Sequence, residues 1–202
     1  MRLGIVCNIV IILSPAIAWT QTQAPPDAMQ VRYVSNQNLA DAVVNVTNTG
    51  TQGGDSATGN ICVNIYAFDP AEEMVSCCAC QVTPGALASF TAAHDLINNT
   101  LGGGVPTSLV VKLVATARTP CNASSPAFAN LASGMRAWAT TAHRLPTVPG
   151  GLATTETPFS PAVLSESELL HLTSFCGFIQ ANGSGFGICR GCKAGSLGGD
   201  NQ

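Results

Sequence analysis

Cysteine is the residue type with the widest chemistry in this chain, and it occurs nine times among 202 residues. Cys7 lies near the start, and the other cysteines form two groups. These groups are Cys62, Cys77, Cys78 and Cys80 in the first half, and Cys121, Cys176, Cys189 and Cys192 in the second. Cysteines form structural disulfides, bind metal ions as thiolates or act as redox pairs. The spacing of the cysteines and the cellular compartment of the protein distinguish these three uses.

The spacing Cys189-x-x-Cys192 is that of a redox pair, and with the cysteine run at 77–80 it is also compatible with zinc or an iron–sulfur cluster. A redox pair of this spacing commonly opens a helix, whose N-terminus stabilises the thiolate. Here the pair follows an expected helix across a glycine-rich segment. Residues 1–18 also have the pattern of an export signal, as described below, and exported proteins fold where disulfides form. We therefore predict structural disulfides, with a metal site and a redox site as the alternatives.

Strand geometry suggests which cysteines could pair. Consecutive residues of a strand face opposite ways, so Cys78 and Cys80 face one way and Cys77 the other. Cys62 lies on the preceding expected strand, and we expect one bridge from it to the cluster at 77–80. We expect a second bridge between Cys176, on the helix, and either Cys189 or Cys192. The remaining pairings stay open.

Other side chains that could act as acids, bases or nucleophiles form no convincing set. His94 precedes Asp95, but adjacent residues need not face one another, and His143 and His171 stand apart. The adjacent Glu72 and Glu73 fit a solvated strand edge. The chain has no G-x-S-x-G motif, and the glycines at 183–187 match no phosphate-binding loop. The sequence therefore predicts no catalytic residue and no cofactor.

Composition excludes several functional classes. Charged residues make up 9% of the chain and the formal net charge is −3, whereas a nucleic-acid-binding domain needs a basic face. Hydrophobic residues make up 46%, too many for a disordered chain. No apolar run reaches the roughly 18 residues of a transmembrane helix. We expect the partner to be an unknown protein or a surface, and self-association is possible. We expect no binding to nucleic acid and no membrane span.

The first eighteen residues have the pattern of a secretory signal peptide. Arg2 supplies the positive charge, residues 3–13 are apolar apart from Asn8, and residues 16–18 (AIA) form a small-x-small cleavage site. Cleavage after Ala18 would remove Cys7 and leave an even number of cysteines, as in a disulfide-bonded exported protein. The expected location is secreted, periplasmic or at the cell surface.

The rest of the chain divides into a leader, a β-rich region and a helical end. Residues 19–28 contain two adjacent prolines and predict a flexible leader. Residues 29–160 contain short β-type segments separated by Gly, Asn, Asp and Pro. The expected strands are 30–34, 42–47, 61–68, 73–80, 87–91, 109–115, 135–143 and 152–157. This pattern predicts a mainly β fold, an antiparallel immunoglobulin-like β-sandwich.

Residues 161–202 predict one helix followed by a loop rich in Gly and Cys. Ser165 and Glu168 fit a capping box, in which the Ser165 hydroxyl accepts from the Glu168 N–H and the Glu168 carboxylate reaches back to the Ser165 N–H. Apolar residues recur at helical spacing at Leu169, Leu172, Cys176 and Ile179. Because Asn182-Gly183 is a stop signal, we expect the helix over 166–181, packed with the loop on one face or end of the sandwich.

Three segments resemble an uncharacterised family of predicted secreted, cysteine-containing proteins from environmental bacteria: 61–84, 107–117 and 155–192. The cysteine run and the sequence GSGFGIC carry the resemblance. The layout of residues 41–117 is also similar to immunoglobulin-like adhesion modules of bacterial surfaces, a likeness of fold only. The resemblance implies a secreted bacterial protein and assigns no activity.

These observations predict a non-catalytic structural or interaction protein of adhesion type at the cell surface or in the extracellular space. The first alternative is a subunit of an extracellular filament, in which the leader adds as a strand to a neighbour's exposed sheet edge. The second alternative is a secreted hydrolase whose catalytic residues converge only in the fold.

We expect the exported protein to consist of residues 19–202 with its eight remaining cysteines oxidised. Its intact mass is then eight hydrogens below that of the reduced chain, because each disulfide removes two. Mass spectrometry with thiol counting and metal analysis measures this directly. Eight free thiols with stoichiometric zinc or iron would establish the metal site instead.

Overall fold

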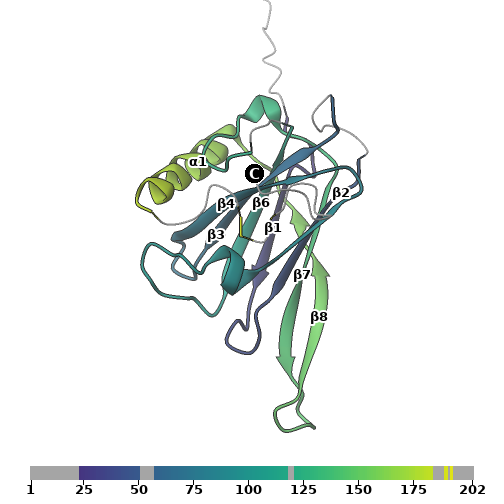
Figure 1. Ribbon diagram of the computed structural model, residues 1–202, viewed down its shortest axis with the longest axis vertical. Helices are drawn as coiled ribbons and strands as arrows, with labels where there is room; N and C mark the ends of the chain where they lie inside the picture. The colour runs from purple at the N-terminus through teal and green to yellow at the C-terminus, as the bar shows by residue number, and fades with distance from the viewer. Residues whose placement is uncertain (1–22, 51–56, 118–120, 184–188, 191, 193–202) are drawn as a thin grey trace, which may run out of the picture.

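The computed structural model describes residues 23–50, 57–117, 121–183, 189–190 and 192. Its strands form two antiparallel sheets, and one helix follows them (Figure 1). The five-stranded sheet has the order β4 (Met74–Val82), β3 (Ile61–Phe68), β6 (Leu109–Thr116), β1 (Met29–Val34) and β9 (Ser160–Pro161). The four-stranded sheet has the order β5 (Leu87–Thr91), β2 (Val43–Asn48), β7 (Met135–Arg144) and β8 (Leu152–Pro158). The expected signal peptide, 1–18, lies outside the described residues.

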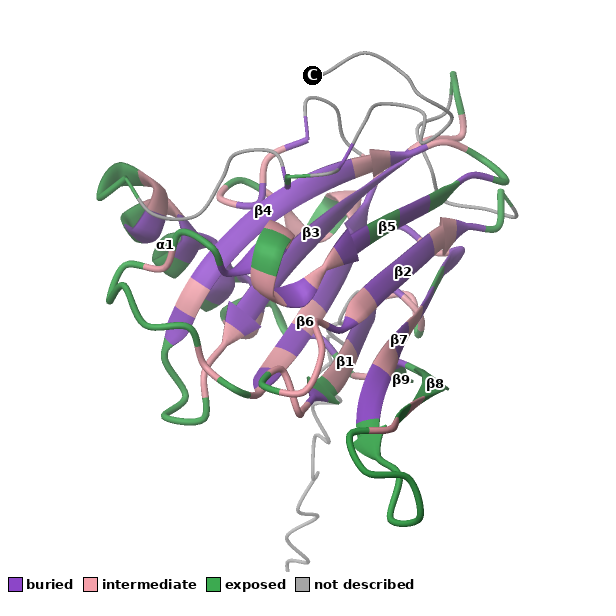
Figure 2. Cartoon of the chain, turned by 60° about the horizontal axis from the view of Figure 1, so that its bottom comes forward, coloured by how far each residue is buried: buried purple, intermediate pink, exposed green. Residues whose placement is uncertain are grey.

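The predicted β-sandwich is confirmed, and its core lies between the two sheets. Alternate residues of β3, Val63 and Ile65, are buried with Leu113 of β6, as the alternation in the sequence predicted. Val44 of β2 and Phe90 of β5 belong to the same cluster from the other sheet. Figure 2 shows buried residues running along β3, β4, β2 and β7. The immunoglobulin-like subtype of the sandwich stays a prediction.

A second core lies on the outer face of the five-stranded sheet, under the helix α1 (Glu166–Ala181). Leu169 and Leu172 of α1 pack there with Tyr66 of β3, whose hydroxyl donates to the Ala123 carbonyl at 2.8 Å. Burial raises the pKa of Tyr66 well above its ordinary value. Because α1 covers this face, both alternating sets of β3 residues are buried.

All eight expected strands and the expected helix are present. The ninth strand, β9, was missed because two residues carry no periodicity. Short helical turns occur at η1 (Ala92–Leu96) and η2 (Phe128–Asn130). The Ser165 hydroxyl accepts from the Glu168 N–H at 3.1 Å, as predicted. The reciprocal half of the capping box was wrong, because the Glu168 carboxylate pairs with Lys112 of β6 at 2.6 Å instead.

The hairpin of β7 and β8 extends beyond the two packed sheets as an arm (Figure 1). Most of β8 is exposed, whereas the first half of β7 is largely buried against β2.

Within the described part of the chain, no helix is both long enough and apolar enough to cross a membrane.

The segment before β1 is fastened to β7 through Asp27. One oxygen of its carboxylate accepts from the Arg136 guanidinium at 2.7 Å and from the Gly134 N–H at 3.0 Å. Burial alone would raise the pKa of Asp27, but these bonds outweigh it and hold the pKa below the ordinary value of 3.8. The next residue, Ala28, is fully buried.

Because folding lowers the pKa of Asp27, its ionised form stabilises the fold above the unfolded pKa, and this contribution is lost as the pH falls through the folded pKa. Arg136 is 58% exposed, so solvent screening limits the contribution to about 0.2–1 kcal/mol. We expect Asp27→Asn to lower the free energy of unfolding by that amount at neutral pH and by nothing well below the folded pKa. Urea unfolding at both pH values measures this, and an equal loss at both would contradict it.

Candidate functional site

All eight cysteines from Cys62 to Cys192 are disulfide-bonded, as predicted, but the predicted pairing was wrong. The four bridges are Cys62–Cys121, Cys77–Cys176, Cys78–Cys189 and Cys80–Cys192. Each joins a cysteine of the first group to a cysteine of the second. Cys62 therefore has no bridge to the cluster at 77–80, and Cys176 has none to Cys189 or Cys192.

The register between β3 and β4 explains why Cys62 could not pair with the cluster. Cys62 lies opposite Gln81, whereas Cys77 lies opposite Tyr66, four residues further along β3. Four residues of a strand span roughly 13 Å, whereas a disulfide needs Cα atoms about 4.4–6.8 Å apart. Cys78 and Cys80 are closer along the hairpin but belong to the opposite face.

Three of the four bridges converge on one short stretch of β4, an edge strand. Cys77 belongs to the outer core and holds α1 through Cys176. Cys78 and Cys80 belong to the inner core and hold Cys189 and Cys192. The Cys189 N–H also donates to the Ala79 carbonyl at 3.0 Å, so this part of the tail pairs with the free edge of β4. Both pieces of chain beyond the sandwich are thus fastened to the same strand.

The redox and metal alternatives gain no support from this arrangement. Cys189 and Cys192 each form a disulfide with β4 and form none with one another. Among the residues placed by the structure, no three His, Cys, Asp or Glu side chains are grouped as metal ligands. The glycine-rich segment at 184–187 lies outside the described residues.

His94 and Asp95, adjacent in sequence, do contact one another: Nδ1 of His94 lies 3.0 Å from Oδ1 of Asp95. Burial opposes ionisation of Asp95, but bonds from the Thr91 N–H, His94 and the Thr91 hydroxyl together hold its pKa below the ordinary value. The Thr91 hydroxyl donates to the carboxylate at 2.8 Å and not to the imidazole. A nucleophile must contact the base, so this cluster holds a turn together and forms no nucleophilic relay.

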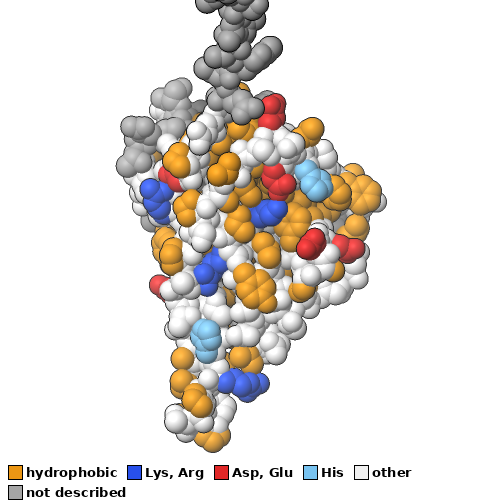
Figure 3. All heavy atoms as spheres, turned by 180° about the vertical axis from the view of Figure 1, so that it is seen from behind, with side chains coloured by type: hydrophobic (Ala, Val, Ile, Leu, Met, Phe, Trp, Pro, Cys, Tyr) orange, Lys and Arg blue, Asp and Glu red, His pale blue; other side chains and the backbone are white. Residues whose placement is uncertain are grey.

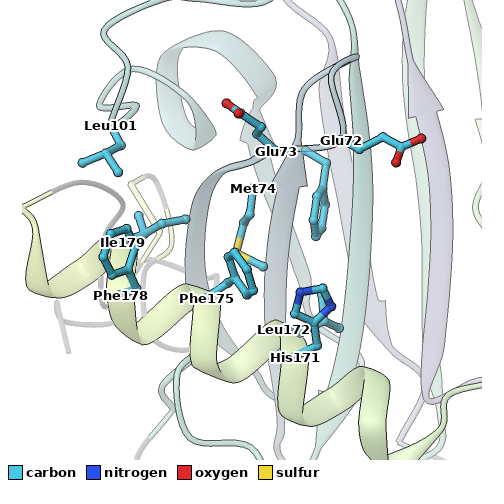
Figure 4. Close-up of a pocket in the computed structure, with 10 residues that line it drawn as sticks. Glu72, Glu73, Met74, Leu101, His171, Leu172, Phe175, Phe178 and Ile179 are labelled. Atoms are coloured by element: carbon cyan, nitrogen blue, oxygen red, sulfur yellow. The ribbon is translucent and has the colours of Figure 1, made fainter.

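The strongest candidate site is an apolar groove of about 470 Å³ between α1, the turn joining β3 to β4 and the loop that follows η1 (Figure 4). Phe68, Met74, Leu101, Phe175, Phe178 and Ile179 line it. Glu72, Glu73 and His171 add the polar groups. We call this set the groove. Its members were separate features in the sequence, and only the fold brings them together.

One flank of α1 supplies the aromatic wall of the groove. His171, Phe175 and Phe178 follow one another at spacings of four and three, which places them on one side of a helix. The His171 and Phe175 rings meet edge to face with centroids 4.5 Å apart. Phe175 remains 47% exposed and Phe178 58%. The buried stripe alone predicted this helix, and the two exposed phenylalanines beside that stripe are the feature of the sequence that points to the groove.

Disulfide and hydrogen bonds hold the walls of the groove in place. Cys176, between the two phenylalanines in sequence, is fully buried and bonded to Cys77 of β4. The loop that carries Leu101 is attached to the end of α1, because the Asn99 amide donates to the Gly183 carbonyl at 3.0 Å. The walls are therefore positioned before any ligand arrives.

The turn between β3 and β4 gives the groove a negative border. The Asp69 carboxylate accepts from the Ala71 and Glu73 N–H groups, each at 2.9 Å, and Glu72 has a φ of 66°. These bonds shape the turn so that Glu72 and Glu73 stand exposed. Neither of these two carboxylates makes an ion pair with another residue that the structure describes. The groove can therefore accept an apolar group accompanied by a positive charge.

Comparison of the chain with protein-family models, curated proteins and solved structures found no match. The resemblance to a family of secreted bacterial proteins therefore stays a prediction.

Removing the bridge under the groove should loosen α1. We expect Cys77→Ala/Cys176→Ala to lower the free energy of unfolding by about 2–4 kcal/mol and to speed amide hydrogen exchange in α1. Cys62→Ala/Cys121→Ala is the matched control, because it removes a bridge that does not involve the helix. Urea unfolding and hydrogen exchange measure the two effects. Unchanged exchange in α1 of the first variant would show that packing alone holds the helix.

Proposed function

We propose that this chain is a non-catalytic interaction protein that acts outside the cytoplasm and binds an apolar segment of a partner in the groove. The observation that carries the proposal is the exposure of large apolar side chains around a preformed hollow. Leu101 is 48% exposed, beside the half-exposed Phe175 and Phe178. Apolar groups gathered at a concave surface are typical of binding sites.

The disulfides support a location outside the cytoplasm. Four bridges in one chain form and persist in oxidising compartments, whereas cytosolic thiols are kept reduced. The expected signal peptide at 1–18 agrees with this location. A secreted, periplasmic or cell-surface protein is therefore part of the proposal, together with the adhesion-type role.

The groove favours binding over hydrolysis. Its described lining contains no Ser, Thr or Cys that could act as a nucleophile. Its polar groups, Glu72, Glu73 and His171, stand at a solvent-exposed border, whereas a catalytic acid or base is commonly enclosed with the substrate away from water. The secreted hydrolase has no comparable observation in its favour.

Only part of the leader is free to add as a strand to a neighbouring molecule. Residues 29–34 already form β1, which pairs with β6 on one side and with β9 at 30–31 on the other. Asp27 is bonded to Arg136, and Ala28 is buried. A filament assembled by the leader would have to use the residues before Asp27.

Binding of a fluorescent apolar amine, 1-aminoanthracene, tests the proposal. We expect saturable binding to the mature protein and at least tenfold weaker binding to Phe175→Ser/Phe178→Ser, because the aromatic wall is lost. Leu170→Ser is the matched control, since Leu170 is 66% exposed on the same helix and does not line the groove. Equal binding by all three proteins, or none by the unaltered protein, would refute the proposal.

A further inference from the structure

The tip of the β7–β8 hairpin, residues 144–152, is a second exposed apolar surface. Leu145 is 38% exposed, Val148 49% and Leu152 43%. The Leu145 N–H donates to the Gly151 carbonyl at 3.0 Å, and the Gly151 N–H donates to the Val148 carbonyl at 2.9 Å. These bonds shape the tip, which we call the hairpin tip, and the packed sheets do not cover it (Figure 1).

Just over half of the large exposed apolar side chains of the described residues lie at two places. Of eleven such large side chains, three lie at the hairpin tip and three at the groove. Figure 3 shows orange side chains at the narrow lower end, where the hairpin lies, and another orange group at the upper right, bordered by red. The arm projects away from α1, so the tip and the groove of one molecule cannot meet (Figure 1).

The charges beside the two surfaces are complementary. Arg144 stands at the base of the hairpin tip, is exposed, and has no ion-pair partner among the described side chains. Glu72 and Glu73 border the groove and are likewise exposed. The groove volume of about 470 Å³ lies within the range of ordinary binding pockets. The groove is therefore large enough to take more than one aliphatic side chain.

We propose that the hairpin tip of one copy of this chain inserts into the groove of the next copy. Val148 and Leu152 contact the aromatic wall, and Arg144 pairs with the acidic border. This inference rests on the proposed function, because it names the partner that the groove takes. The two contacting surfaces differ, so each copy offers one free tip and one free groove, and the assembly grows head to tail into a ring or a filament.

Sedimentation analysis of two blocked variants tests the assembly. We expect the unaltered mature protein to form species larger than dimers at micromolar to millimolar concentrations. Val148→Ser/Leu152→Ser lacks the tip contact, and Phe175→Ser/Phe178→Ser lacks the groove contact, so each alone should be monomeric. An equimolar mixture should contain dimers and nothing larger, because one intact tip meets one intact groove. Leu87→Ser is the control, since Leu87 is 46% exposed on β5, away from both surfaces.

Charge reversal tests the same contact without removing apolar area. Arg144→Glu alone, and Glu72→Lys/Glu73→Lys alone, should each weaken association at least tenfold, because like charges then meet. The combined variant should recover most of the affinity. Failure of the combined variant to recover, with each variant shown to be folded by circular dichroism, would overturn the assigned pairing.

The outcomes separate this inference from the proposed function. An unaltered protein that binds 1-aminoanthracene in the groove yet stays monomeric would leave the groove as a binding site and overturn self-assembly, assigning the groove to a different partner. Oligomers that persist in both blocked variants, or a mixture that stays monomeric, would also overturn it. A protein that neither binds the probe nor associates would refute both.

Discussion

The alternation of side chains along β4 is the constraint on which the rest of the structure depends. Consecutive strand residues face opposite sides of a sheet, so Cys77 faces α1, whereas Cys78 and Cys80 face the tail. The helix and the tail are thereby fastened to opposite faces of one edge strand. A helix cannot join a sheet through a ladder of backbone hydrogen bonds, and the described tail makes one backbone hydrogen bond with β4. The disulfides therefore supply attachment that backbone pairing does not.

This attachment also determines which surfaces face outward. Because Cys176 and the buried stripe of α1 face β4, the flank with Phe175 and Phe178 is turned towards the β3–β4 turn. The hairpin of β7 and β8 belongs to the other sheet and extends away from the helix (Figure 1). The molecule therefore presents an apolar hollow with a negative border at one place and an apolar tip with a positive base at another. Different, complementary surfaces of this kind suit repeated assembly in one direction.

Local patterns explain which parts of the fold could be predicted. The alternation of Ile61 to Phe68 and of the other strands predicted eight strands, and Ser165 predicted the start of α1. The reciprocal capping contact failed because Lys112, far away in sequence, competes for the Glu168 carboxylate. An ion pair with a partner from another element leaves no local signal, so the capping box could be predicted only in part.

The sequence by itself determined eight strands, the helix α1, the sandwich class and the presence of eight cysteines suited to bridges, because periodicity, capping and residue type act over a few neighbouring positions. Only the tertiary structure decided the disulfide pairing and the candidate site. The pairing depends on the register that sets Cys62 opposite Gln81 and on the face that α1 covers. The groove joins Glu73, Leu101 and Phe175, which are distant in sequence. Proximity across elements is a property of packing, and no local pattern encodes it.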